Sequence, residues 1–159
     1  MRFALTTAGL ATVTLAGTAT GASVNFVHDL DRWAGEHSWQ VHAGSWSGTT
    51  VASMYYLAGS FVYNGVSSVS IVTSPASADY FGTAFGTLDL AAGTYQVAMQ
   101  DTYGDGWAWN SFVGGLSIGS GSGTVSGSSA SFSFTVVPAP GAMALLGLAG
   151  LAARRRRRD

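Results

Sequence analysis

Alternation of apolar and polar positions is the clearest signal along this chain. In the stretch GTYQVAMQD, Tyr95, Val97 and Met99 are separated by polar or small residues, and ASFSFTVV at residues 130–137 repeats the pattern. This period of two is typical of half-buried strands, because successive side chains of a strand point to opposite faces. Shorter runs predict six further strands, which are Val24–His28, Ser38–Ala43, Val51–Leu57, Ser60–Tyr63, Val69–Thr73 and Gly115–Ile118.

The predicted strands are separated by glycine and serine, and no ten-residue stretch between them has a convincing helical period. About eight short strands in one domain predict an all-β fold, a small antiparallel β-sandwich of jelly-roll-like form. We assign this domain to residues 23–136. The glycine- and serine-rich stretch at residues 119–129 is expected to be a mobile loop or an edge hairpin.

The N-terminal segment interrupts the alternation. Residues 1–22 carry one positive charge at Arg2, then a mildly apolar stretch from Phe3 to Gly17, then small residues. That order is the layout of a secretory signal peptide. We place cleavage after Ala22, with cleavage after Ala19 as the alternative.

The C-terminal segment is also distinct. Gly141–Ala153 contains no polar side chain, two prolines precede it, and five arginines follow it. As a helix it would measure about 20 Å, less than the ~30 Å hydrocarbon core of a bilayer. Arginine stems extend the effective span by reaching toward the interface, and the arginine cluster is expected to stay on the cytoplasmic side. The segment therefore predicts a membrane-inserted apolar helix with the body of the protein outside.

Residues 137–159 resemble the PEP-CTERM sorting signal of bacterial exported proteins, which combines a short proline motif, an apolar helix and a terminal arginine cluster. Ala139 stands where that family has its glutamate. The resemblance implies recognition by an integral-membrane exosortase, transient membrane insertion, and delivery to the surface or matrix of an organism that makes exopolysaccharide. Removal of the tail and its retention as a permanent anchor both stay open. The signal residues are Val137, Pro138, Ala139, Pro140, Arg154, Arg155, Arg156, Arg157 and Arg158.

Two blocks of the body resemble a domain that recurs in secreted proteins of bacteria and algae. In the first, Leu30–Ser53, Glu36, Ser38 and Trp39 match the pattern, and His37 replaces its threonine. In the second, Leu88–Trp109, the stretch DTYGDG matches except that Thr102 replaces a serine. The resemblance covers roughly residues 29–118 and implies an extracellular β-domain without a defined reaction.

Charge and cysteine content exclude several classes. Residues 23–138 hold one arginine and seven acidic side chains, so this body repels phosphate backbones and we expect no nucleic-acid partner. The chain has no cysteine, which excludes disulfides, cysteine-bound zinc and a cysteine nucleophile.

The stretch DTYGDG follows a predicted strand and carries two candidate cation ligands. Asp101 and Asp105 suit a tight turn, because aspartate accepts backbone N–H bonds and Asp-Gly provides a positive φ. The alternative is calcium, which prefers oxygen ligands. Asp31 and Glu36 would then complete the site. A structural turn is the favoured interpretation, and calcium is the only cofactor we consider.

Aromatic and histidine residues give weaker candidates. Trp107 and Trp109 would share one side of an extended segment and form a sugar-stacking patch, or they would instead cap the sandwich core. His37 and His42 are expected on opposite faces of one strand, and His28, His37 and His42 are expected at surface or half-buried positions. No H-E-x-x-H or G-x-S-x-G motif is present in the chain.

These observations lead to one expectation with alternatives. We expect an exported, non-enzymatic cell-surface or matrix protein with a structural or adhesive role. A carbohydrate-binding or calcium-stabilised module within exopolysaccharide is the first alternative. A secreted hydrolase that uses a carboxylate pair such as Glu36 with Asp31, or Asp101 with Asp105, is the second.

Overall fold

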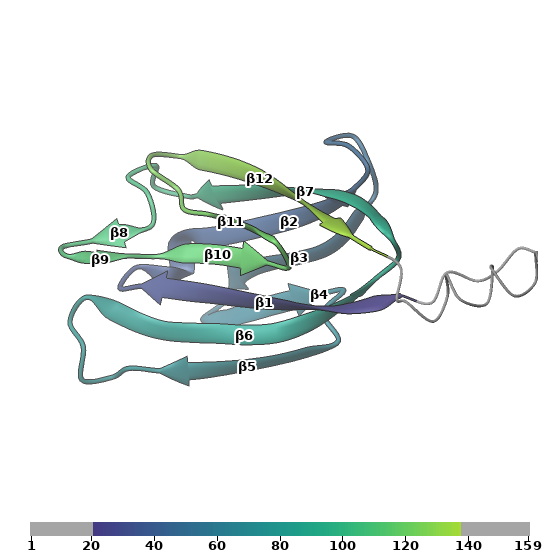
Figure 1. The fold of residues 1–159 in the computed structure, drawn as a ribbon. Coiled ribbons are helices and arrows are strands. Elements are labelled where there is room, and N and C mark those ends of the chain that lie inside the picture. The colour runs from purple at the N-terminus through teal and green to yellow at the C-terminus, as the bar shows by residue number, and fades with distance from the viewer. Residues whose placement is uncertain (1–20, 138–159) are drawn as a thin grey trace, which may run out of the picture.

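The fold is a sandwich of two antiparallel five-stranded sheets (Figure 1). A computed structural model describes residues 21–137 of the chain. One sheet has the strand order β11-β10-β1-β6-β5 and the other has the order β12-β7-β2-β3-β4. A small hairpin, β8-β9, stands apart from both sheets. The β-sandwich predicted from the alternating pattern is therefore confirmed.

The bounds of the eight predicted strands agree with the structure to within a few residues, whereas β6 and the short strands β8 and β9 were not predicted. The elements are β1 (Ala22–Asp31), a 3-10 helix η1 (Ala34–Glu36), β2 (His37–Ala43), β3 (Thr50–Leu57), β4 (Ser60–Asn64), β5 (Ser68–Thr73), β6 (Tyr80–Leu90), β7 (Gly93–Asp101), β8 (Ala108–Trp109), β9 (Phe112–Val113), β10 (Gly115–Ile118), β11 (Gly121–Gly123) and β12 (Ser129–Val136). The expected edge hairpin is β10-β11, with β11 at the edge of its sheet.

The core lies between the two sheets and follows the predicted alternation. Tyr95, Val97 and Met99 of β7 are all buried, as are Phe134 and Val136 of β12. The partner sheet contributes the alternate positions of β1 in the same way. The inward faces of the central strands therefore carry most of the apolar burial that stabilises the fold.

Aromatic rings link the two sheets in the middle of this core. Phe26 of β1 meets Trp39 of β2 edge to face, with ring centroids 5.7 Å apart. Tyr63 of β4 stacks on Phe26 at 6.1 Å. Trp39 is 1% exposed, so its predicted inward orientation is confirmed. Such contacts add to burial because ring edges and faces attract each other.

The two ends of the sandwich differ. β1 begins and β12 ends at one end, which is the right-hand side of Figure 1, while the β8-β9 hairpin lies at the other end. β12 and β7 are antiparallel with Val136 paired to Gly93, so β7 runs away from that first end and finishes at Asp101. The candidate site described next lies where β7 finishes.

Candidate functional site

Three acidic side chains converge where β2 begins and β7 ends. Glu36 closes η1 and is followed directly by β2, and Asp101 is the last residue of β7. Asp105 lies in the loop that follows. One carboxylate oxygen of each residue lies within 4.8 Å of those of the other two. The fold therefore joins parts of the chain that are 65 residues apart in sequence.

Backbone hydrogen bonds hold this arrangement together. His37, which follows Glu36, is paired with Asp101 in the β2–β7 ladder. The amide of Thr102 donates to the carbonyl oxygen of Glu36 over 3.1 Å, and the Thr102 hydroxyl donates to the same oxygen over 3.2 Å. These bonds fix the backbone of Glu36 beside that of Asp101 and Thr102.

The loop after β7 is a tight turn of the kind that Asp and Gly favour. The amide of Gly104 donates to Oδ1 of Asp101 over 2.5 Å. Gly106 has a φ of +96°, and a Cβ there would lie 2.7 Å from the carbonyl oxygen of Val125. Glycine is therefore required at position 106 by both backbone conformation and space. The geometry agrees with the tight turn predicted from the sequence. The turn does not provide a hydrogen-bond partner for the second carboxylate oxygen of Asp101, Oδ2.

The electrostatics of the cluster are uncompensated. Partial burial raises the pKa of Glu36, and the neighbouring carboxylates of Asp101, Asp105 and Asp31 raise it further. Within residues 21–137 the sole arginine is Arg32, whose guanidinium donates to the carbonyl oxygen of Ala78 instead of an acid.

Asp31 does not join the other three acids. Its Oδ1 accepts the amide of Trp33 over 2.8 Å and lies 3.1 Å from Nε2 of His37. A register shift between Leu30 and Asp31 buries two successive side chains of β1, which turns Asp31 toward the interior. Of the four acids that the sequence analysis grouped, the structure thus brings three together and directs the fourth to a histidine.

Asp31, His37 and His28 form a buried polar chain that begins next to the acidic cluster, since His37 directly follows Glu36. His28 and His37 face each other from opposite sheets, with Nε2 of His28 3.2 Å from Nδ1 of His37. Both are buried, contrary to the expected surface or half-buried positions. Burial lowers the pKa of His28 well below its ordinary value, and His37 lowers it further. His42 is half-buried on the opposite face of β2 from His37, as predicted.

Trp107 covers this polar chain. Its ring stacks on His37 at a centroid distance of 4.4 Å and an interplanar angle of 12°, and it lies 4.9 Å from the ring of His28. The indole Nε1 donates to the carbonyl oxygen of Gln100 over 3.2 Å. Because Trp107 is 0% exposed, it closes the core and offers no face to a sugar.

Trp109 is separated from Trp107 and pairs with another tryptophan. Its ring meets that of Trp33 edge to face at 5.7 Å. Trp33 is 46% exposed, and the guanidinium of Arg32 lies over its ring, 5.6 Å from the centroid. The aromatic surface at this end is therefore formed by Trp33 and Trp109. The sequence predicted a patch of Trp107 with Trp109 instead.

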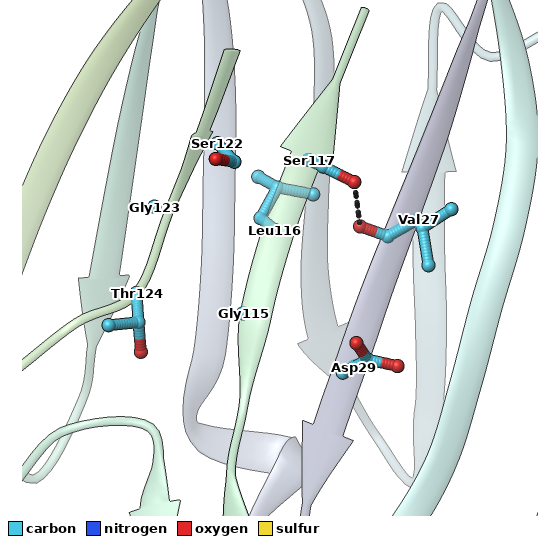
Figure 2. Close-up of a pocket in the computed structure, with 8 residues that line it drawn as sticks. All are labelled: Val27, Asp29, Gly115, Leu116, Ser117, Ser122, Gly123 and Thr124. Atoms are coloured by element: carbon cyan, nitrogen blue, oxygen red, sulfur yellow. Dashed lines mark hydrogen bonds between the residues drawn. The ribbon is translucent and has the colours of Figure 1, made fainter. Parts of the chain in front are cut away.

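A shallow hollow lies on the outer face of β1, β10 and β11 (Figure 2). It is lined by Val27, Asp29, Gly115, Leu116, Ser117, Ser122, Gly123 and Thr124. Asp29 is the only ionisable residue that lines it, and Asp29 already accepts a hydrogen bond from Thr83 over 2.7 Å. With one ionisable group, which is already engaged, the hollow provides no arrangement for acid–base chemistry.

Comparisons of this chain with protein-family models, with curated proteins and with solved structures give no match. Among residues 21–137, no helix is long and apolar enough to cross a bilayer. The signal-peptide residues 1–20 and the sorting-signal residues from Pro138 to Arg158 lie outside the described residues. Val137, the first residue of the sorting motif, directly follows β12 and is exposed.

Proposed function

We propose that this chain is an exported, non-enzymatic protein of the bacterial cell surface or extracellular matrix. The observation that carries the proposal is the order of parts along the chain. The strands occupy Ala22 to Val136, so all of them except the first residue of β1 lie between the two terminal segments that have the composition of transport signals. Both five-stranded sheets of the sandwich are formed within Ala22–Val136.

The arrangement of the strands supports this division. Ala22 and Val136 line the same hollow at one end of the sandwich, so both terminal segments join the body at that end. The acidic cluster and the Trp33–Trp109 pair belong to the other end, where β7 finishes. A body held at the membrane by its C-terminal segment would therefore present these groups to the exterior.

The partners follow from the C-terminal segment. In the proposal, the arginine cluster Arg154–Arg158 stays cytoplasmic while the apolar helix enters the membrane for a short time. An exosortase-type protease then recognises the proline motif at Val137–Pro140. The released body resides in exopolysaccharide at the surface or in the matrix.

The test is an intact-mass measurement on protein extracted from the cell surface of the producing bacterium. Loss of about the first 22 residues together with the arginine-rich tail supports the proposal. Loss of the first segment alone would indicate a permanent anchor. A full-length polypeptide found only in the cytosol would contradict the proposal.

A second candidate, binding of exopolysaccharide, is favoured by one specific observation. The half-exposed Trp33 and its partner Trp109 present aromatic surface beside a guanidinium, and aromatic faces stack on the C–H faces of sugar rings. A glycan array with the full chain tests it, with Trp33→Ala as the variant. Trp46→Ala is the matched control, because Trp46 is 52% exposed in a different loop. Binding that survives Trp33→Ala would rule out this surface.

A further inference from the structure

We propose that Glu36, Asp101 and Asp105 bind one calcium ion, which fastens the loop after β7 to η1. The site goes beyond the proposed function and does not depend on export, because the same carboxylates would meet in a chain that stays inside the cell. Export matters only for supply, since extracellular modules bind calcium at Kd values of about 0.1–1 mM.

The spacing of the carboxylates fits a shared ion. Calcium–oxygen distances are about 2.3–2.6 Å, so two oxygens bound to the same ion lie no more than about 5 Å apart. The three carboxylate oxygens here lie within 4.8 Å of one another without any adjustment. All three ligands are oxygen atoms, the ligand type that a hard cation prefers.

A buried atom without a partner provides an independent indication of a ligand. Asp101 is 5% exposed, and its Oδ2 is buried with no hydrogen-bond partner among the described residues. Its Oδ1 is already used by the amide of Gly104. A buried carboxylate oxygen without a partner is costly, so a structural turn alone does not explain this carboxylate. A cation held with Glu36 and Asp105 would satisfy Oδ2.

No side-chain cation of the described part of the chain takes this position. The guanidinium of Arg32 is bonded to Ala78 and lies over Trp33. The imidazole of His37 lies beside the cluster, and both of its nitrogens face other groups of the described residues, namely Asp31 and His28. Three neighbouring carboxylates thus repel one another without internal compensation.

Calcium fits the setting better than magnesium. Magnesium demands a near-ideal octahedron and keeps most of its waters, whereas calcium accepts irregular sets of six to eight oxygens. Here the ligands differ in burial, since Asp101 is buried, Glu36 is half-buried and Asp105 is exposed. The exposed side leaves room for water to complete an irregular shell.

The first measurement is thermal unfolding of the full-length chain in a nonionic detergent, in EDTA and then in increasing calcium chloride. Calcium at 100 times its Kd is expected to raise Tm by about 5–10 °C, because an ion that binds only the folded state stabilises it by mass action. Magnesium at the same concentration is expected to raise Tm by less than half as much. Equal Tm values in EDTA and in 10 mM calcium would overturn the proposal.

Variants then assign the effect to the cluster. Asp105→Asn and Glu36→Gln are expected to weaken calcium binding at least about tenfold, while each melts at or above the wild-type Tm in EDTA because one repulsive charge is gone. Asp89→Asn is the matched control, since Asp89 is an exposed acid of β6 whose paired residue in β1 is Ser23, near the opposite end. A calcium response that is unchanged in both cluster variants would also overturn the proposal.

Discussion

At the scale of single residues, the buried imidazoles of His28 and His37 are the least expected feature. The sequence predicted surface or half-buried positions, but in the structure His28 continues the inward series of Val24 and Phe26, and His37 that of Trp39. What the sequence did not show is that the two series face each other across the sandwich. The hydrogen bond of 3.2 Å between the two rings and the stacking of Trp107 on His37 stabilise the imidazoles in the interior.

The titration of His28 predicts how stability depends on pH. Its pKa in the fold lies well below the ordinary 6.5, so between these two values the unfolded chain binds a proton that the folded chain does not. The free energy of unfolding is therefore expected to fall as pH drops below about 6.5, by up to about 1.4 kcal/mol per pH unit. Urea unfolding between pH 7.5 and 5.5, in EDTA, measures this slope.

The matched variants for this experiment are His28→Gln and His42→Gln. Glutamine keeps an amide donor for His37 but does not titrate, so His28→Gln is expected to flatten the slope. His42 lies on the outer side of β2, and its variant should keep the slope. Glu36, whose pKa is raised, acts in the opposite direction at lower pH, and its contribution cancels when variants are compared. An unchanged slope in His28→Gln would refute the prediction.

The two tryptophans near the site predict unequal costs of truncation. Trp107→Ala removes a 0% exposed ring and its bond to Gln100, so we expect a loss of about 3–5 kcal/mol in the free energy of unfolding. Trp109→Ala removes a half-buried ring with one aromatic partner and should cost about 1 kcal/mol. Chemical unfolding of both variants measures the difference, and equal losses would contradict these burial assignments.

At the scale of elements, β6 shows where the alternating pattern misleads. Its inward positions include Ala84 and Leu88 but also two glycines, while Phe85 is exposed on the outer face. A half-buried strand usually has large apolar residues on its inner face and polar residues on its outer face. β6 has small residues inside and phenylalanine outside, so no strand was predicted there. The inner space is instead filled from β1, whose Phe26 is paired with Gly86.

Gly86 is expected to be intolerant of even a methyl group. A Cβ at this position would lie 2.0 Å from the carbonyl oxygen of Ser68 and 2.6 Å from the ring of Phe26. We expect Gly86→Ala to lower the free energy of unfolding by about 1–3 kcal/mol through overpacking. Gly115→Ala in β10 is the control, because its Cβ would meet only one atom, at 3.4 Å, and should change stability by less than about 0.5 kcal/mol. Denaturant midpoints compare the two, and similar losses would argue against this packing.

The candidate site was predictable only in part. The turn residues Asp101 and Asp105 are readable from a local motif, because aspartate and glycine have specific roles in turns. The convergence of Glu36 with them depends on the β2–β7 register, which alternation alone does not determine. The diversion of Asp31 depends on a single bulge in β1 and left no trace in the pattern.

At the scale of the whole molecule, the two ends of the sandwich have separate tasks in our proposal. One end receives both terminal segments, and the other holds the acidic cluster, where Tyr103 is 81% exposed. Because the chain contains no cysteine, Tyr103→Cys creates a single reporter thiol. We expect a membrane-impermeant maleimide to label this variant in intact bacteria. The wild-type chain is the control, and labelling that requires cell lysis would contradict export.

The position of β1 in its sheet has a consequence for how the chain acquires its structure. β1 is a central strand, and its Val27 is paired with Phe85 on one side and with Ser117 on the other, 90 residues farther along. Among the described residues β1 is the first strand to be synthesised, and both of its ladders can close only after β10 has been made. Such distant pairings make folding slow, on the order of milliseconds to seconds. In the export proposal, a translocation channel would therefore receive the chain before both ladders of β1 have closed.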